Sequence, residues 1–221
     1  MQGDSRFTEG LLNLAEAGRY LHVPQQTFHR WARGYRRGEP LLHVLEPEHR
    51  RLPVTLIALA EGHVMDALRD AGVRPQKIRP ALQRLRAEFG NEYVLVAPEL
   101  ATDGIDVLWD FARSAEGEGL IAADSGQQVF REIVADQMEY IAWDNDGVPT
   151  QVELRHWAPS KVIVDVGQSF GQPVFAGTRV RVADVAGMMK AGEEAGTVAA
   201  EFGIPISDVR TAARILLGRA A

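Results

Sequence analysis

Several polar side chains between residues 25 and 37 have the chemistry to contact a nucleic acid. Glutamine can pair bidentately with adenine and arginine with guanine, while arginine also binds phosphate oxygens. The candidates for base contacts are Gln25, Gln26, His29 and Arg30, with Thr27 beside them. The candidates for phosphate contacts are Arg33, Arg36 and Arg37. The pattern predicts that this segment binds DNA.

Two short helices joined by a tight turn are predicted to position these side chains. Apolar residues recur at helical spacing over residues 14–21 and again over residues 25–35. Pro24 can open the second helix but cannot continue the first, because proline has no N–H to donate. In a helix-turn-helix the second helix enters the major groove, and here Phe28 and Trp31 supply its apolar inner face. The predicted recognition helix therefore runs from about Gln25 to Tyr35.

The charge of the chain is divided unequally along its length. Over all 221 residues the net charge is -6, but residues 14–37 hold five arginines against the single acid Glu16. Residues 92–153 hold 14 acids against only Arg113 and Arg131. This asymmetry suggests a polyanion-binding segment joined to a body with a different role. The alternative is an amphipathic helix pair with an ordinary solvated basic face.

The spacing of apolar and turn residues predicts an α+β, mostly helical chain in three parts. Residues 1–40 form the helix-turn-helix, residues 41–158 a mixed α/β middle region, and residues 159–221 a trihelical, winged-helix-like domain. The middle region is predicted to hold helices over 53–71, 75–89 and 130–141, and strands at 41–45, 93–96, 105–111 and 141–148. A brief strand over 162–165 precedes C-terminal helices over 182–191, 197–202 and 207–217, the last capped by Ser207.

Two segments carry a resemblance to known families. The run Gln25-Gln26-Thr27-Phe28-His29-Arg30-Trp31 resembles the start of recognition helices in excisionase-like and MerR-like regulators. The run Gly171-Gln172-Pro173-Val174-Phe175-Ala176-Gly177-Thr178-Arg179-Val180 fits the pattern G-x-P-x-x-x-G-T-R-[VI]. With the helices that follow, it resembles a prokaryotic domain of unknown function, number 433. Read from the residues alone, the glycines and the proline of this run have a structural role.

The combination of the two resembles VapB-like antitoxins of type II toxin-antitoxin systems, which are encoded beside PIN-like ribonuclease toxins. The resemblance implies a protein that neutralises such a ribonuclease and represses its own operon. Antitoxins of this kind often place a C-terminal arginine among the acids of the toxin. The candidates here are Arg210, Arg214 and Arg219, although an ordinary helix surface explains them equally well.

No catalytic residue, cofactor or metal site is predicted. The chain has no cysteine and contains neither H-E-x-x-H nor G-x-S-x-G. Asp144-Asn145-Asp146-Gly147 starts like a calcium loop but lacks the Glu at position twelve, so a hairpin turn is expected. The leading alternative is a stand-alone helix-turn-helix regulator whose acidic middle region binds a small molecule. A hydrolytic enzyme would require the acids of 99–146 to converge on a metal.

The expected partners are operator DNA, a PIN-like ribonuclease toxin and a second copy of the chain in a homodimer. The N-terminal residues lack the apolar core of a signal peptide, and no stretch approaches the roughly 20 apolar residues of a membrane span. The expected location is the cytoplasm, without a membrane partner. Residues 179–221 hold six bases and five acids, which favours dimerisation or partner contact over DNA binding for that end of the chain.

Overall fold

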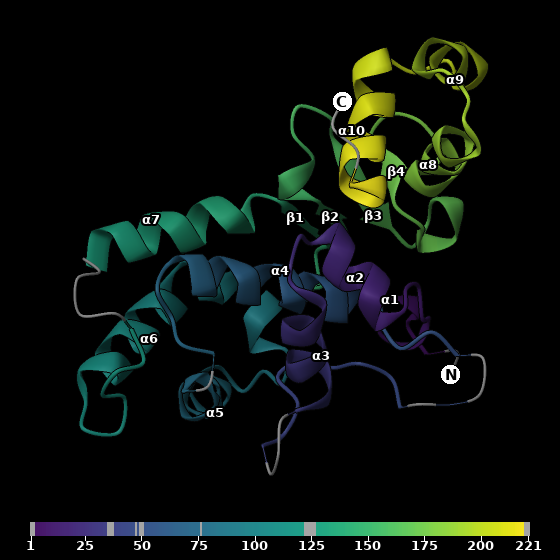
Figure 1. Ribbon diagram of the computed structural model, residues 1–221. Coiled ribbons are helices and arrows are strands. Elements are labelled where there is room, and N and C mark those ends of the chain that lie inside the picture. The colour runs from purple at the N-terminus through teal and green to yellow at the C-terminus, as the bar shows by residue number, and fades with distance from the viewer. Residues whose placement is uncertain are drawn as a thin grey trace.

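The computed structural model describes residues 3–34, 38–46, 48, 51–75, 77–121 and 127–218. Helices dominate these residues, and a small antiparallel sheet lies between the middle region and the C-terminal helices (Figure 1). The predicted α+β, mostly helical class is confirmed. None of the helices in this part of the chain is long and apolar enough to cross a membrane.

The elements follow one another in three groups. The first holds α1 (Ser5–Thr8), α2 (Leu14–Tyr20) and α3 (Gln25–Arg33). The second holds α4 (Leu56–Asp70), α5 (Ile78–Phe89), η1 (Val94–Val96), η2 (Pro98–Ala101), α6 (Asp103–Arg113) and α7 (Gln127–Met138). The third holds β1 (Ile141–Trp143), β2 (Pro149–Glu153), η3 (Arg155–Trp157), β3 (Val162–Asp165), η4 (Ser169–Gly171), β4 (Val174–Phe175), α8 (Val182–Ala191), α9 (Ala195–Phe202) and α10 (Ile206–Leu217).

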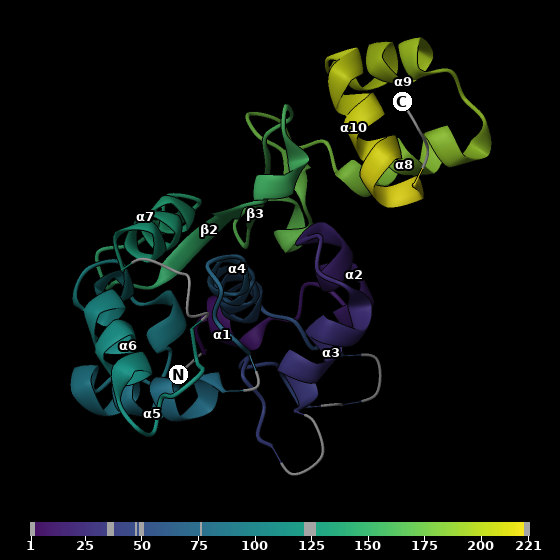
Figure 2. The same ribbon diagram turned by 60° about the vertical axis from the view of Figure 1, so that its left-hand side comes forward.

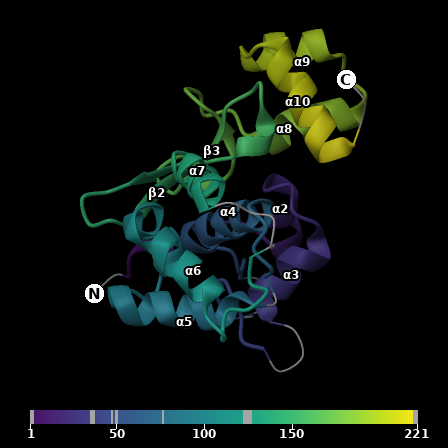
Figure 3. The same ribbon diagram turned by 90° about the vertical axis from the view of Figure 1, so that its left-hand side faces the viewer.

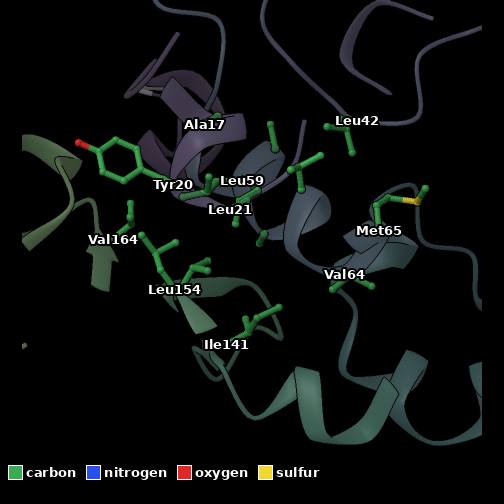
Figure 4. Close-up of a cluster of buried hydrophobic side chains, with 14 of the residues drawn as sticks. Ala17, Tyr20, Leu21, Leu42, Leu59, Val64, Met65, Ile141, Leu154 and Val164 are labelled. Atoms are coloured by element: carbon green, nitrogen blue, oxygen red, sulfur yellow. The ribbon is translucent and has the colours of Figure 1, made fainter. Parts of the chain in front are cut away.

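Helix α4 is the centre of the fold. Every residue from Leu56 to Leu68 is buried, because the helix is largely apolar on all sides. Thr55 caps its start by accepting a hydrogen bond from the backbone N–H of Ala58 at 3.1 Å. Figure 4 shows Leu21 from the N-terminal helix pair and Leu154 from the sheet region in one buried cluster with residues of α4. The helix pair and the sheet therefore share the core that α4 provides.

The four strands form an antiparallel sheet in the order β1-β2-β3-β4. The turn between β1 and β2 is the hairpin expected at Asp144-Asn145-Asp146-Gly147: the Asp144 N–H donates to the Val148 carbonyl at 2.9 Å. Gly147 has a φ of +72°, a conformation that favours glycine. On the far side of this turn Arg6 pairs with Asp146 at 2.6 Å, so the acids at the hairpin bind a side chain of the same protein.

Three predicted strands are wrong. Residues 41–45 are irregular, and the backbone N–H of Leu41 donates to the carbonyl of Trp31 at 2.7 Å instead of to a strand. Residues 94–96 form the short helix η1, and residues 105–111 lie within α6. The apolar residues in these runs pack into the core from helical or irregular backbone. A short apolar run alone does not distinguish a strand from a buried helix segment.

The three C-terminal helices occur as predicted, each within two residues of its expected start. The predicted cap at Ser207 is wrong, because α10 begins at Ile206 and Ser207 lies inside its first turn. Asp208 instead accepts a hydrogen bond from the Ser160 hydroxyl at 2.6 Å. This bond attaches α10 to the loop ahead of β3.

The two ends of the chain lie on different sides of α4. In Figures 1, 2 and 3, α3 and α5 lie on one side of α4, and α8, α9 and α10 lie on the other. Helix α10 packs on α8 and α9 and also contacts α2. The C-terminal helices therefore touch the first helix of the N-terminal pair through α10.

A buried histidine on α4 gives the fold a specific dependence on pH. His63 is 1% exposed and its Nε2 lies 2.9 Å from the Gln137 carbonyl. Burial lowers the pKa of His63 to about 4. Between about pH 6.5 and 4 the unfolded chain binds a proton at this residue and the folded chain does not, so stability falls as the pH falls.

We therefore expect His63→Gln to reduce this loss. Over the same pH range, the free energy of unfolding of the wild type should fall relative to that of the variant by about 3 kcal/mol. Urea titrations of both proteins at pH 7 and pH 4 measure this difference. An equal fall in the free energy of unfolding of both proteins would show that His63 does not titrate as its burial requires.

Candidate nucleic-acid interface

The first helix of the pair, α2, has a complete N-terminal cap. Asn13 Oδ1 accepts from the Glu16 backbone N–H at 2.9 Å, and the Glu16 carboxylate accepts from the Asn13 backbone N–H at 2.9 Å. This reciprocal arrangement satisfies two backbone donors that the start of a helix otherwise leaves unpaired. It fixes where α2 begins and so where the turn toward α3 falls.

The turn that joins α2 to α3 is tight and closely packed. The Val23 N–H donates to the Gly18 carbonyl at 2.8 Å, and His22 has a φ of +60°. A Cβ at Gly18 would lie 3.1 Å from the Val23 carbonyl oxygen and 3.4 Å from Cβ of Phe28. Pro24 directly precedes α3, where its carbonyl accepts from Phe28 at 3.0 Å. The predicted opening of the second helix at Pro24 is thus present.

Helix α3 has one buried and one exposed face. Phe28, Trp31 and Ala32 are buried. The exposed side chains are Gln25, Gln26, His29 and Arg30, and those of Thr27 and Arg33 are half-buried. Residues 26, 30 and 33 are spaced by four and three, so they share the face opposite the core. Arg36 and Arg37, and Tyr35 at the predicted end of the helix, lie outside the described residues.

The buried face of α3 rests on α4. A Cβ added at Gly62 would lie 2.8 Å from Cε2 of Phe28 and 3.0 Å from Cδ1 of Leu21. A larger residue at this position would force the helix pair away from α4. Because the contact is this close, α4 serves as the third helix that holds α3 in place.

The segment that follows α3 is fastened by a histidine between two glutamates, which the sequence analysis missed. His43 Nδ1 lies 2.5 Å from Oε1 of Glu61, which is 1% exposed, and Nε2 lies 3.2 Å from Glu92. Burial opposes protonation, but the bonds to both carboxylates raise the pKa of His43 above its ordinary value. In the same segment the Leu45 carbonyl accepts a 3.5 Å bond from Arg33. These contacts fix the chain beside the end of α3.

The short helix η3 links the N-terminal helix pair to α4. Arg155 pairs with Asp66 and, at 2.5 Å, with Asp70 of α4. The Trp157 indole N–H donates to the Tyr20 carbonyl at 3.1 Å, and the two rings stack with centroids 5.8 Å apart. Tyr20 is buried in this contact, which raises its pKa to about 12. The orientation of α2 is therefore coupled to the chain that leads into β3.

The arginines expected to meet a toxin lie on or beyond α10. Arg210 is exposed. Arg214 is also exposed but donates to the Ala158 carbonyl at 3.1 Å, so part of its guanidinium is already engaged. Arg219 lies outside the described residues. Arg210 and Arg214 are four residues apart and share one face of the helix.

The acidic middle region does not assemble a metal site from the residues that the structure describes. Among them, no group of three or more histidines and carboxylates has the arrangement to hold a metal ion. Three of the acids of 99–146 are committed to ion pairs: Asp106 pairs with Arg131, and Asp144 and Asp146 both pair with Arg6. The convergence that a metal-dependent hydrolase requires is not seen among these residues.

Comparisons with known proteins match both ends of the chain. The family model described as "Putative DNA-binding HTH domain" matches residues 10–82, and "Protein of unknown function (DUF433)" matches residues 162–214. The first match contains α2, α3 and α4 and the first residues of α5.

Whole-length relatives come from Mycobacterium tuberculosis. "Putative antitoxin VapB45" is 39% identical, and the match covers 96% of this chain and 98% of that protein. The uncharacterized protein Rv2308 is 28% identical over 90% of this chain and 86% of its own length. The crystal structure of Rv2018 superposes with a TM-score of 0.79 at 36% identity, over 94% of this chain and 99% of that one. The chain therefore belongs to the family of "Putative antitoxin VapB45" and carries a DNA-binding helix-turn-helix domain ahead of a DUF433 domain.

Proposed function

We propose that the protein is a type II antitoxin and autorepressor. Helix α3 binds operator DNA, and the rest of the chain dimerises and neutralises a PIN-like ribonuclease. The DNA-binding part of the proposal rests on the exposed face of α3, which carries glutamine and arginine side chains. Phe28 on the opposite face packs against Gly62 of α4 and holds the helix in place. Similarity to VapB45 supports the antitoxin part.

In this proposal the three parts of the chain have different roles. Residues 1–40 supply the DNA contacts, residues 41–158 hold α3 in place, and residues 159–221 meet the toxin. The C-terminal helices lie on the side of α4 opposite to α3, so DNA bound at α3 leaves them accessible (Figure 2). Their nearly balanced charge favours a protein partner over DNA. Arg210, Arg214 and Arg219 are the proposed toxin contacts.

Replacing both Arg30 and Arg33 with alanine is expected to weaken operator binding. Each base contact that is lost costs about 1–3 kcal/mol, and each phosphate contact that is lost lowers the salt dependence. Fluorescence anisotropy with a labelled duplex from upstream of the protein's own gene measures both effects. The matched control is Arg210→Ala, which removes the same kind of charge from an exposed position on α10. Unchanged binding by the double variant would exclude α3 as the DNA reader.

Co-expression with the product of the neighbouring gene tests the antitoxin part. We expect the two proteins to copurify and the toxicity of the partner to be relieved. If DNA binding is present but both effects are absent, the better account is a stand-alone regulator whose middle region binds a small molecule. A palindromic operator would support the homodimer, because the symmetry of the half-sites mirrors that of the protein.

A further inference from the structure

A recess lies beside α3, on the side toward α5. Its volume is about 480 Å³. It is lined by Thr27, Arg30 and Trp31 of α3, by Gly38 and Leu41 of the following segment, by Pro75 ahead of α5, and by Arg79 in the first turn of α5. Helices α3 and α5 lie on the same side of α4 in Figure 3. The recess therefore adjoins the exposed face of α3, although four of these seven lining residues come from outside the helix pair.

The lining has the chemistry of a phosphodiester site. Arg30 and Arg79 are permanent cations and hydrogen-bond donors, and Thr27 adds a hydroxyl. Among the residues that the structure describes, no acid lines the recess. Trp31 and Pro75 give the recess an apolar wall, which suits the sugar next to a phosphate. Contacts to phosphate and sugar position a protein on DNA without reading its sequence.

Arg79 is held in place before any ligand binds. Its Nε and Nη2 both donate to the Glu39 carbonyl, at 2.8 Å and 2.6 Å. A Cβ at Gly38 would lie 2.8 Å from Cζ of Arg79, so the absence of a side chain there permits the close approach. An arginine that is already oriented loses less conformational freedom when it binds an anion.

On the basis of the proposed DNA-binding function, we infer that this recess binds a phosphodiester group of the DNA backbone next to the base contacts of α3. Arg79 is a principal ligand of that group. Helix α5 thereby extends the DNA contact beyond the helix pair. Lys77, two residues before Arg79, is also basic, but it donates to the Glu118 carbonyl at 2.7 Å and does not line the recess. The assignment is therefore specific to Arg79 and does not follow from the positive charge of this segment.

Arg79→Ala in the full chain tests the assignment. Binding is measured by anisotropy at several salt concentrations, with the upstream duplex and with a duplex of scrambled sequence. The slope of log affinity against log salt is negative, and its magnitude should decrease by about 0.9. Over a tenfold rise in salt, the variant should therefore lose roughly eightfold less affinity than the wild type. Because a phosphate carries no sequence information, the loss should be similar on both duplexes.

Arg84→Ala is the matched control. Arg84 is five residues further along α5, so it points roughly 140° away from Arg79 at about 100° per residue. It is exposed and pairs with Glu88 at 3.8 Å. Its removal should leave the salt slope unchanged. Arg79→Lys keeps the charge but not the planar guanidinium, and it should recover only part of the affinity.

The outcomes separate this inference from the DNA-binding proposal. If the Arg30 and Arg33 double variant loses affinity while Arg79→Ala behaves like Arg84→Ala, the recess is not a backbone site and the proposed function stands. If the wild type binds neither duplex, the proposed function itself fails. If Arg79→Ala lowers the midpoint of urea unfolding, the DNA affinity of Arg79→Lys is compared with that of Arg84→Ala instead. Full affinity and an unaltered salt slope in Arg79→Lys would overturn the role of the guanidinium.

A calorimetric titration with inorganic phosphate distinguishes the source of the anion. We expect no saturable heat that depends on Arg79, because a lone phosphate lacks the neighbouring sugar and the base contacts of α3. Phosphate binding that Arg79→Ala abolishes, together with unchanged DNA binding by that variant, would assign the recess to a free phosphate instead.

Discussion

Replacing Phe28 with alanine is expected to lower the free energy of unfolding by about 3–5 kcal/mol. Phe28 is fully buried where α2, α3 and α4 meet. Gly62 lies against the ring, so the backbone of α4 borders the space that the ring would vacate. Backbone does not collapse into a cavity as a flexible side chain does, and the cost therefore belongs at the upper part of the range for such substitutions. Urea titration measures the change.

Phe170→Ala is the matched control for this prediction. Phe170 is 86% exposed in the turn before β4, so the same substitution there should change the unfolding free energy by less than about 0.5 kcal/mol. DNA affinity should fall in Phe28→Ala, since the same ring sets the position of α3. Equal stability losses in the two variants would contradict the placement of α3 on α4.

Removing the carboxylate of Asp66 is expected to cost about 3–5 kcal/mol. Asp66 is 1% exposed and accepts a hydrogen bond from Arg155. Nη2 of Arg69 lies 2.7 Å from Oδ1 of Asp66, in an ion pair without hydrogen-bond geometry. Burial alone would raise the pKa of Asp66, but bonds from His156 and Arg155 hold it below its ordinary value. In Asp66→Ala the side chain of Arg155, which is 12% exposed, retains its charge without its most buried partner.

Asp70→Ala provides the comparison for Asp66. Asp70 lies one turn further along α4 and pairs with the same arginine at 2.5 Å, but its side chain is 41% exposed. A pair that water screens contributes little, so this variant should lose less than about 1 kcal/mol. The double variant Asp66→Leu with Arg155→Met should recover most of the loss, because it leaves no buried charge without a partner. Equal losses in Asp66→Ala and Asp70→Ala would show that burial does not govern the cluster.

The helix pair was predictable because its signals are local. Helical spacing, the break at Pro24 and the apolar pair Phe28 and Trp31 all lie within about twenty residues, and α2 and α3 form where these signals place them. The strand expected over 105–111 failed because Ile105 and Leu108 pack as one face of α6. Apolar residues in a short run fit a helix or a strand until their neighbours in space are known.

Parts of the site that depend on distant residues were not predictable in the same way. Arg155 and Asp66 are 89 positions apart, and Arg79 meets the carbonyl of Glu39 from 40 positions away. One signal was present: Glu61 and Asp66 are acids within the mostly apolar, buried stretch of α4. Charges inside a buried helix require partners, so these positions indicated long-range contacts without identifying them.

The assignment of DNA to α3 and of the toxin to the C-terminal helices is tested most directly by two double variants in one pair of assays. Arg30→Ala with Arg33→Ala and Arg210→Ala with Arg214→Ala each remove two positive charges. The first is expected to lose at least about tenfold in affinity for the upstream duplex while still copurifying with the neighbouring gene product. The second is expected to keep the DNA affinity and to weaken copurification. The opposite pattern, with DNA binding lost only in the second variant, would contradict the account.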